Sequence, residues 1–242
     1  MIVLSVGMPR AGSGWHYNLT HDLVVASGGV PARAIRRRFR LGRILTEVNC
    51  NIGTLSAKRL LPVLVPGLLG STFVIKAHAG PKPLAKLLIR AGLLRTTYIY
   101  RDPRAALLSA YEYGRRAVAK GRPNAFSPLE NIDMAIDFIG EYVRIWQAWM
   151  AFDQVLHVRY EDLLADYDAE ITRLLSFLRI TANEHTAAVV EQYRPGHASE
   201  DQQGLHFHKG QAERFRDALS AEQLAACARA FGPVLEQMGY VI

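Results

Sequence analysis

A glycine-rich stretch near the start of the chain combines residue types that bind phosphate. It runs from Gly7 to Trp15 and follows the short apolar run Ile2–Gly7. Glycines let backbone amides turn inward, and a helix that begins there adds the positive end of its dipole. Arg10 supplies a full positive charge and Ser13 a hydroxyl donor. The stretch therefore predicts an anion site, with a plain tight turn between a strand and a helix as the alternative.

The same loop satisfies half of the phosphate-loop pattern of nucleotide triphosphatases. Gly7 and Gly12 stand at the two glycine positions of that pattern. Ser13 and Gly14 stand where it requires Lys and then Ser or Thr. The missing lysine would contact the terminal phosphates, and the missing hydroxyl would hold magnesium. A nucleotide kinase of related topology is therefore disfavoured, and it is kept as the main alternative among enzymes.

A histidine follows another apolar run, Phe73-Val74-Ile75-Lys76-Ala77-His78. A lone histidine is more often structural than catalytic, so its position in the expected fold decides. His78 comes directly after a predicted strand, and ligands bind at the carboxyl ends of the strands in parallel sheets. A neutral imidazole can accept a proton near pH 7. His78 is therefore the candidate general base, and Lys76 is a candidate cation beside it.

Four short apolar runs are typical of strands that are buried on both faces of a parallel sheet. They are Ile2–Gly7, Thr72–Ala77, Thr97–Arg101 and Val155–Arg159. Helical patterns alternate with them: Trp15–Ser27, Pro103–Ala119, Pro128–Phe152, Leu163–Leu178 and Glu184–Tyr193. A last helix is expected from the capping-box residue Ser220 to Gly239. The alternation predicts an α/β fold, in which helices flank a central parallel sheet that begins with a phosphate-loop-like strand–loop–helix, in one domain over residues 1–242.

The composition is that of an ordinary globular protein, with 50% hydrophobic and 21% charged residues, which argues against a disordered chain. The net charge of +7 suits an anionic ligand, and it would equally suit nucleic acid or an acidic membrane face. Cys50 and Cys227 show no metal-ligand spacing, so we expect reduced thiols and no metal. No run approaches the roughly 18 apolar residues of a membrane span. We expect a cytoplasmic protein.

The loop resembles the 5′-phosphosulfate loop of the sulfotransferase superfamily, which reads Pro-Lys/Arg-Ser-Gly-Thr-Thr-Trp in broad form. Here the residues are Pro9-Arg10-Ala11-Gly12-Ser13-Gly14-Trp15. The resemblance implies 3′-phosphoadenosine 5′-phosphosulfate (PAPS) as the donor and PAP as the product. It also implies that Arg10 holds the 5′-phosphate and the bridging oxygen, that Ser13 and the Gly14 amide contact this phosphate, and that Trp15 flanks the adenine. Ala11 and Gly14 replace a serine and a threonine, so one hydroxyl contact passes to the backbone.

A second block, Tyr98–Ser109, resembles the family's 3′-phosphate signature. In that signature a strand leads into Arg-Asn/Asp-Pro, and a serine follows eight residues after the arginine; here these are Arg101 and Ser109. Arg101 ends a predicted strand, and Pro103 begins a helix on which Ser109 can face the same phosphate. Arginine supplies a rigid fork that matches phosphate oxygens. The alternative is a strand-end arginine that caps a neighbouring helix.

Three shorter blocks follow the same family pattern. Tyr160 begins a segment similar to the family's Tyr-Glu-Asp-Leu, in which the tyrosine approaches the adenine. Lys76 and His78 match a Lys-x-His in which the histidine is the base. The segment that clamps the 3′-phosphate reads Arg-Lys-Gly in the family, and it corresponds here to His208, Lys209 and Gly210. Because His208 replaces an arginine, we expect a weaker or pH-sensitive clamp, on a long loop, Gly196–Gly210, that orders on binding.

The resemblance implies an enzyme that moves a sulfuryl group by in-line transfer to a hydroxyl or amine of a small-molecule, saccharide or lipid acceptor. A run of basic residues could recognise such an acceptor or touch a membrane surface. The alternative is a solvated helix face that only adds solubility. Its members are Arg33, Arg36, Arg37, Arg38, Arg40 and Arg43. A non-catalytic nucleotide- or nucleic-acid-binding protein is the rival from another class. That rival leaves His78, Arg101 and Lys209 unexplained, so we expect no nucleic-acid partner; the oligomeric state stays open.

Overall fold

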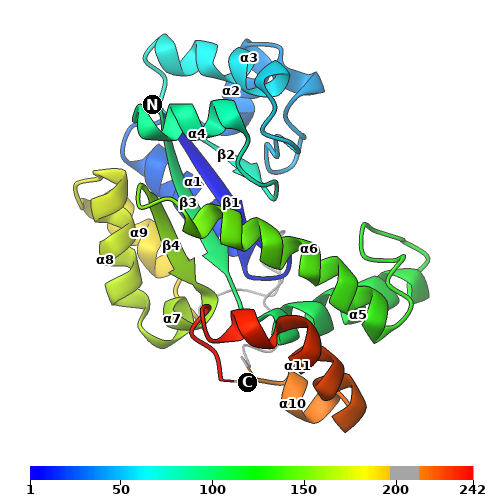
Figure 1. The fold of residues 1–242 in the computed structure, drawn as a ribbon. Helices are drawn as coiled ribbons and strands as arrows, with labels where there is room; N and C mark the ends of the chain where they lie inside the picture. Colours follow the sequence, from blue (N-terminus) through cyan, green and yellow to red (C-terminus); the bar gives the residue numbers. More distant parts are fainter. Residues whose placement is uncertain (197–212, 242) are drawn as a thin grey trace.

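The computed structural model describes residues 1–196 and 213–241. Four strands form one parallel sheet in the order β2-β1-β3-β4 (Figure 1). The strands are β1 (Ile2–Gly7), β2 (Phe73–Ala77), β3 (Leu94–Tyr100) and β4 (Val155–Arg159). Because β2 and β3 lie on opposite sides of β1, the order reverses at β1. In this arrangement ligands bind outside the carboxyl ends of β1 and β3.

Helices connect the strands and cover the sheet. Between β1 and β2 lie α1 (Ser13–Ala26), α2 (Ala32–Arg38), the 3-10 turn η1 (Leu41–Arg43) and α3 (Ala57–Leu68). α4 (Pro83–Arg90) follows β2, and α5 (Pro103–Ala119) and α6 (Ile132–Met150) follow β3. After β4 come α7 (Tyr160–Ala165), α8 (Tyr167–Leu178), α9 (Glu184–Gln192), α10 (Phe215–Ala218) and α11 (Ala221–Leu235). The predicted α/β architecture around a parallel sheet is confirmed.

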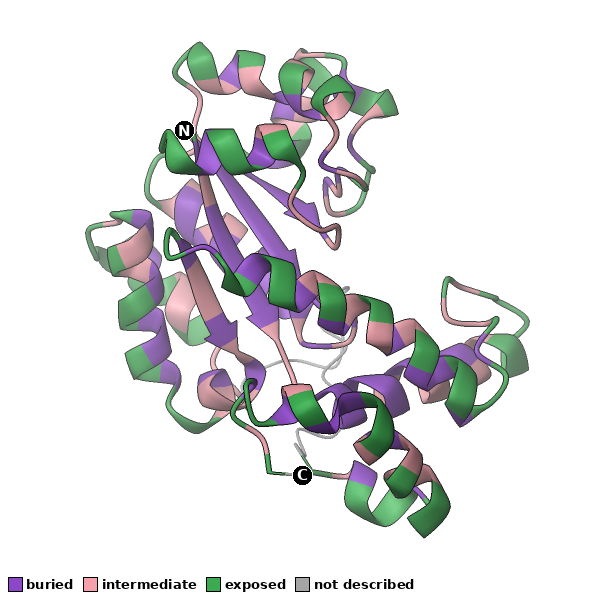
Figure 2. Ribbon diagram, viewed as in Figure 1, coloured by how far each residue is buried: buried purple, intermediate pink, exposed green. Residues whose placement is uncertain are grey.

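β1 and β2 are buried along their whole length, β3 is buried over most of its residues, and β4 at the edge of the sheet is partly exposed (Figure 2). Ile2, Leu4 and Val6 of β1 belong to one apolar core, which also contains residues of α2 to α6 and α11. Val3 belongs to a second core, formed with α1, α7, α8 and α9. Successive side chains of a strand point to opposite faces, so both sets must be apolar. This double burial explains why the strands appear in the sequence as continuous rather than alternating apolar runs.

Several predicted boundaries move because polar side chains cap the helices. α6 begins at Ile132 and not at Pro128, since the Asn131 side chain accepts a hydrogen bond from the Met134 amide at 2.9 Å. The helix predicted over Leu163–Leu178 is two helices. They are separated at Asp166, whose carboxylate accepts from the Ala169 amide at 3.1 Å and caps α8. The capping box predicted at Ser220 is present at the start of α11.

The helices that the sequence did not predict include α3 and α4, and α3 is the more instructive. It contains Pro62 and Pro66, each of which removes a backbone donor from a helix interior. Its buried side chains include Leu60 and Val63, and the Cα of Gly67 packs against Ile2 so closely that a Cβ there would lie 2.8 Å from the isoleucine. Tertiary packing therefore outweighs local propensity in α3. Across the described residues, none of the helices combines the length and apolar content needed to cross a bilayer.

Two helix-interior glycines should respond in opposite ways to alanine. A Cβ at Gly114 of α5 would lie 2.1 Å from the Phe126 carbonyl oxygen, whereas a Cβ at Gly140 of α6 meets nothing within 4 Å. We expect Gly114→Ala to lower the free energy of unfolding by about 1–3 kcal/mol through overpacking. The matched control, Gly140→Ala, should raise it by about 0.5–1 kcal/mol. Urea unfolding measures both, and equal effects of the two substitutions would contradict the described packing of α5 on the loop at Phe126.

Candidate active site

The loop between β1 and α1 is shaped by two residues with positive φ, Arg10 at 64° and Gly12 at 76°. The Met8 amide donates to the Ile99 carbonyl at 3.0 Å, which ties the loop to β3. A Cβ at Gly12 would lie 2.6 Å from a ring carbon of Tyr160, the residue that follows β4. Both its conformation and this close approach require glycine at position 12. The loop is therefore fixed by contacts to two other strand ends.

The N-terminus of α1 faces this loop without a side-chain cap. Gly12 occupies the N-cap position, and within the described residues no side chain bonds to the first-turn amides and no acidic residue stands in the first turn. The first amides of a helix carry partial positive charge and need acceptors. Ser13 is the first residue of the helix, and its side chain is buried. The uncapped end of α1 is thus suited to an anion.

Arg10 reaches from the loop to α5. Its Nε donates to the Ser109 hydroxyl at 3.2 Å, and its guanidinium lies 4.3 Å from the centroid of the Tyr113 ring. Burial, together with the charges of Arg116 and Arg101, lowers the pKa of Arg10 to about 10. Among the described residues no carboxylate pairs with Arg10. A bound anion would stabilise the charged form of such a cation, because it would offset the repulsion from the neighbouring arginines.

Arg101 follows β3 and lies at the same edge of the sheet. Its guanidinium stacks 4.7 Å from the centroid of the Tyr160 ring, and its Nε lies 4.0 Å from an oxygen of Glu161. Tyr160 therefore contacts both the phosphate loop, at Gly12, and Arg101. Ser109 was predicted to face the same phosphate as Arg101. The hydrogen bond found for Ser109 goes to Arg10, and its contact with a phosphate stays a prediction.

His78 lies at the end of β2, one strand away from the loop. Its Nδ1 is 2.6 Å from the Gly7 carbonyl oxygen. Because a carbonyl can only accept, Nδ1 carries the hydrogen and Nε2 keeps its lone pair. Burial and the charge of Lys76 lower the pKa of His78 to about 4. The ring is therefore neutral near pH 7 and can accept a proton at Nε2.

Lys76 is buried on β2, two residues before His78. Burial lowers the pKa of its ammonium to about 8, and its Nζ lies 5.9 Å from the centroid of the Tyr17 ring. Residues two apart on a strand point to the same face. The lysine thus places a titratable positive charge close enough to lower the pKa of the histidine, and its role in the reaction stays a prediction.

Trp15 has a different setting from the one expected. It is 4% exposed, and its indole N–H donates to the Tyr193 carbonyl at 3.0 Å. Its ring stacks on Tyr167 at 6.2 Å between centroids and meets Tyr160 edge-on at 6.1 Å. Trp15 is thus a member of the core around α1, and its contact with an adenine stays a prediction. His208, Lys209 and Gly210 lie outside the described residues, as does almost all of the predicted Gly196–Gly210 loop.

Two residues, Tyr113 and His16, make contacts that the sequence did not predict. Tyr113 stands four residues after Ser109 on α5, and this i, i+4 spacing could have revealed that both reach Arg10. His16 was also missed. It is 1% exposed, its Nε2 lies 3.0 Å from the Thr97 hydroxyl, and burial lowers its pKa to about 4. Nothing in its local sequence distinguishes it from an ordinary helical histidine.

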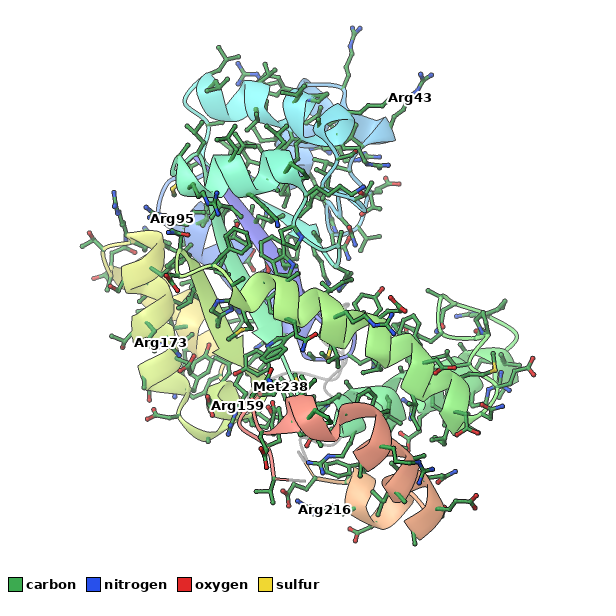
Figure 3. All side chains as sticks on the ribbon, in the orientation of Figure 1. Arg43, Arg95, Arg159, Arg173, Arg216 and Met238 are labelled. Atoms are coloured by element: carbon green, nitrogen blue, oxygen red, sulfur yellow. The ribbon has the colours of Figure 1, made fainter. Side chains whose placement is uncertain are left out.

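The structure divides the basic run after α1 into two groups. Arg33 donates to the Val48 carbonyl at 2.7 Å and Arg36 to the Leu45 carbonyl at 2.8 Å, so these two hold the loop after η1. The others are exposed, and Arg43 projects away from the fold (Figure 3). They are Arg37, Arg38, Arg40 and Arg43. No contact in the structure tests their role toward an acceptor or a membrane surface, which stays a prediction.

Comparison with solved structures supports the fold. The fold is similar to that of retinol dehydratase in complex with androsterone and PAP, with 17% identity, a TM-score of 0.59, and 97% of this chain and 80% of that chain covered. It is also similar to the mouse sulfotransferase SULT7A1 complexed with PAP, with 15% identity, a TM-score of 0.61, and 97% and 84% covered. At these identities the likeness shows the fold alone. No curated protein sequence matches the chain.

The family assignment comes from a different comparison. Residues 68–239 match the family described as Sulfotransferase domain. This segment includes β2, β3, β4 and the residues His78, Arg101, Ser109 and Tyr160, and it leaves the phosphate loop outside. The loop geometry is thus an observation independent of the match. Because the matched segment covers well over half of the chain, this protein belongs to the sulfotransferase domain family.

Proposed function

We propose that this sulfotransferase moves a sulfuryl group from PAPS to a hydroxyl of a small-molecule acceptor, with His78 as the general base. The observation that carries the proposal is the hydrogen bond of His78 Nδ1 to the Gly7 carbonyl, which leaves Nε2 free to accept a proton beside the phosphate loop. We propose further that residues 1–242 act as one domain. Both apolar cores share the single described sheet, which supports this.

The donor fits the cationic edge of the sheet. The uncapped N-terminus of α1, with Ser13, the Gly14 amide and Arg10, would hold the 5′-phosphate. Arg101 and Ser109 would hold the 3′-phosphate, and Tyr160 would approach the adenine. The mutual repulsion of Arg10 and Arg101 supports this assignment, because a ligand with two separate phosphates relieves it. Solved structures of similar fold contain PAP, which is such a ligand.

The expected reaction is an in-line displacement at sulfur. The acceptor oxygen forms a bond to sulfur while its proton passes to Nε2 of His78. The bond between sulfur and the bridging oxygen breaks, and the electron pair stays on the 5′-phosphate of PAP. Arg10 and Lys76 would stabilise the negative charge that develops there. His78 then returns its proton to solvent.

The acceptor is proposed only by class. Solved structures of similar fold contain androsterone or retinol, which supports a small-molecule acceptor. A saccharide or lipid, and an amine in place of the hydroxyl, are the alternatives that the sequence left open. Screening alcohols, amines, glycolipids and saccharides with labelled PAPS would distinguish them.

The donor assignment predicts a nucleotide preference that calorimetry can measure. We expect adenosine 3′,5′-bisphosphate to bind more tightly than ATP with magnesium, because the loop lacks the lysine and hydroxyl that a metal-bound triphosphate needs. Arg101→Ala should reduce the affinity for PAP more than the affinity for adenosine 5′-phosphate, since only PAP carries a 3′-phosphate. A preference for ATP with magnesium would refute the donor assignment and favour a kinase.

The role of His78 predicts a loss of turnover without a loss of donor binding. In His78→Ala the rate of transfer at saturating PAPS should fall by about 10²–10⁴-fold, the usual contribution of a general base. The affinity for PAP should stay within a few-fold. His185→Ala, which changes an exposed histidine of α9, serves as the matched control and should keep full activity. Near-normal transfer by His78→Ala would remove His78 from the base role.

The pKa shifts predict a broad pH profile. His78 must be neutral to act as a base, and its pKa is lowered to about 4, so kcat/KM for PAPS should fall on the acid side near pH 4 and not near 6.5. Lys76 must be charged, and its pKa is lowered to about 8, so the alkaline fall should begin near pH 8. Lys76→Arg should move only the alkaline fall to higher pH. An acid fall near 6.5 would contradict the described environment of His78.

A further inference from the structure

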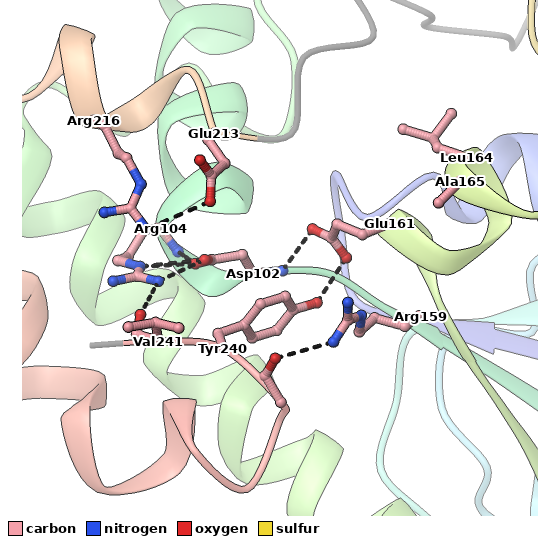
Figure 4. Close-up of a pocket in the computed structure, with 11 residues that line it drawn as sticks. Asp102, Arg104, Arg159, Glu161, Leu164, Ala165, Glu213, Arg216, Tyr240 and Val241 are labelled. Atoms are coloured by element: carbon pink, nitrogen blue, oxygen red, sulfur yellow. Dashed lines mark hydrogen bonds and ion pairs between the residues drawn. The ribbon is translucent and has the colours of Figure 1, made fainter.

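The last described residues of the chain line a cavity together with Asp102, the residue that follows Arg101. It has a volume of about 490 Å³ and lies between the start of α5, the end of β4 with α7, and the C-terminal segment Gly239–Val241 (Figure 4). Its lining includes Arg104 and Arg159, and also Glu161, the neighbour of Tyr160. The lining of the cavity thus combines the C-terminal segment with residues at the ends of β3 and β4, where the proposed donor site lies.

Two arginines fix the backbone of the C-terminal segment. Arg159 Nη1 donates to the Gly239 carbonyl at 3.0 Å, and its guanidinium lies 5.2 Å from the centroid of the Tyr240 ring. Arg104 Nη2 donates to the Val241 carbonyl at 2.7 Å and to Asp102 Oδ2 at 2.8 Å. The segment is therefore attached to β4 through one arginine and to the start of α5 through the other.

The side chain of Tyr240 reaches the neighbourhood of Arg101 through one carboxylate. Its hydroxyl donates to Glu161 Oε2 at 2.7 Å. The other oxygen of Glu161 accepts from the Asp102 amide at 3.3 Å and lies 4.0 Å from Arg101 Nε. Figure 4 shows the Tyr240 and Asp102 bonds converging on the two oxygens of Glu161. These bonds fix the orientation of the carboxylate beside the guanidinium of Arg101.

We propose that Tyr240 is a positioning residue, which orients Glu161 so that this carboxylate holds the Arg101 guanidinium in place for the donor's 3′-phosphate. The inference rests on the proposed function, in which Arg101 binds that phosphate. A side chain that touches the ligand is effective only when its orientation is fixed by neighbours. Tyr160 is one such neighbour, through stacking, and Glu161, held by Tyr240, is another.

The environment of Glu161 explains why the hydroxyl of Tyr240 matters. Burial raises the pKa of Glu161, whereas the hydrogen bond from Tyr240, the Asp102 amide and the charge of Arg101 oppose that rise. The tyrosine hydroxyl thus helps to keep the carboxylate charged in a buried setting. Tyr240→Phe removes this hydrogen bond and leaves the number of charged side chains near Arg101 unchanged.

The test compares two nucleotides that differ by one phosphate, adenosine 3′,5′-bisphosphate (PAP) and adenosine 5′-phosphate. In Tyr240→Phe we expect the affinity for PAP to fall by about tenfold, the effect of losing one hydrogen bond to a charged group. The affinity for adenosine 5′-phosphate should not change, and kcat at saturating PAPS should also be retained. In an Arg101→Ala background the same substitution should have no further effect on PAP binding.

Tyr193→Phe is the matched control. It removes a similar tyrosine–carboxylate bond, to Asp22 at 2.6 Å, in the other core. We expect it to destabilise the fold about as much as Tyr240→Phe, in urea unfolding, without changing the preference for PAP. An equal loss of both nucleotides in Tyr240→Phe, no loss of either, or a full effect in the Arg101→Ala background would overturn the positioning role.

A separate outcome tests whether Arg101 binds a 3′-phosphate at all. If the wild-type protein binds PAP and adenosine 5′-phosphate equally well, the 3′-phosphate site at Arg101 is refuted, and the role of Tyr240 falls with it. If the wild-type protein prefers PAP and Tyr240→Phe keeps that preference, the positioning role alone is refuted and the proposed donor site stands. The two failures are therefore distinguishable in one set of titrations.

Discussion

The close packing of the Tyr160 ring on the backbone of Gly12 connects the parts of the site that come from different strands. The ring comes from the end of β4, and Gly12 lies in the loop that follows β1. Any side chain at position 12 would meet the ring at 2.6 Å and displace it. Arg101, from the end of β3, stacks on the same ring. One aromatic ring therefore fixes the relative positions of the phosphate loop and the arginine proposed for the 3′-phosphate.

The arginines at this edge of the sheet differ in how far a carboxylate neutralises their charge. Arg10 rests on the ring of Tyr113, so its charge is not neutralised by a carboxylate among the described residues. Arg104 forms an ion pair with Asp102 at 2.8 Å, so a carboxylate of the protein neutralises its charge. A buried guanidinium on an aromatic ring keeps its capacity to bind phosphate, whereas a paired one contributes mainly to structure. Arg101 is intermediate, since it has both a ring and the more distant carboxylate of Glu161.

The proposed base, His78, and the loop after β1 are coupled through the main chain at Gly7. The carbonyl of Gly7 accepts from His78, and Gly7 is also the last residue of β1 before the loop begins. A Cβ at Gly7 would lie 2.6 Å from Ile99 of β3 and 2.9 Å from Ser13 of α1. The position of the imidazole is thus set by the same strand end that sets the loop. A main-chain carbonyl thus orients the imidazole of the proposed base.

Local patterns in the sequence predict the four strands, several of the helices and one edge of the candidate site. The four buried strands, the loop with Arg10, and His78 and Arg101 after their strands follow from local patterns, because the carboxyl ends of parallel strands meet at one edge. The break at Asp166 and the proline-containing α3 did not follow, since capping and packing decided them.

The tertiary structure alone decided which side chains meet across large separations in the chain. Arg10 contacts Ser109 and Tyr113 of α5, and Tyr240 contacts Glu161, 79 positions earlier. Trp15 is buried against Tyr167 and bonds to Tyr193, although its motif indicated a ligand contact. Local patterns specify which residues are apolar, charged or turn-forming. They do not specify how far α5 and the segment after α11 return toward the strand ends, because that distance is set by packing of the whole core.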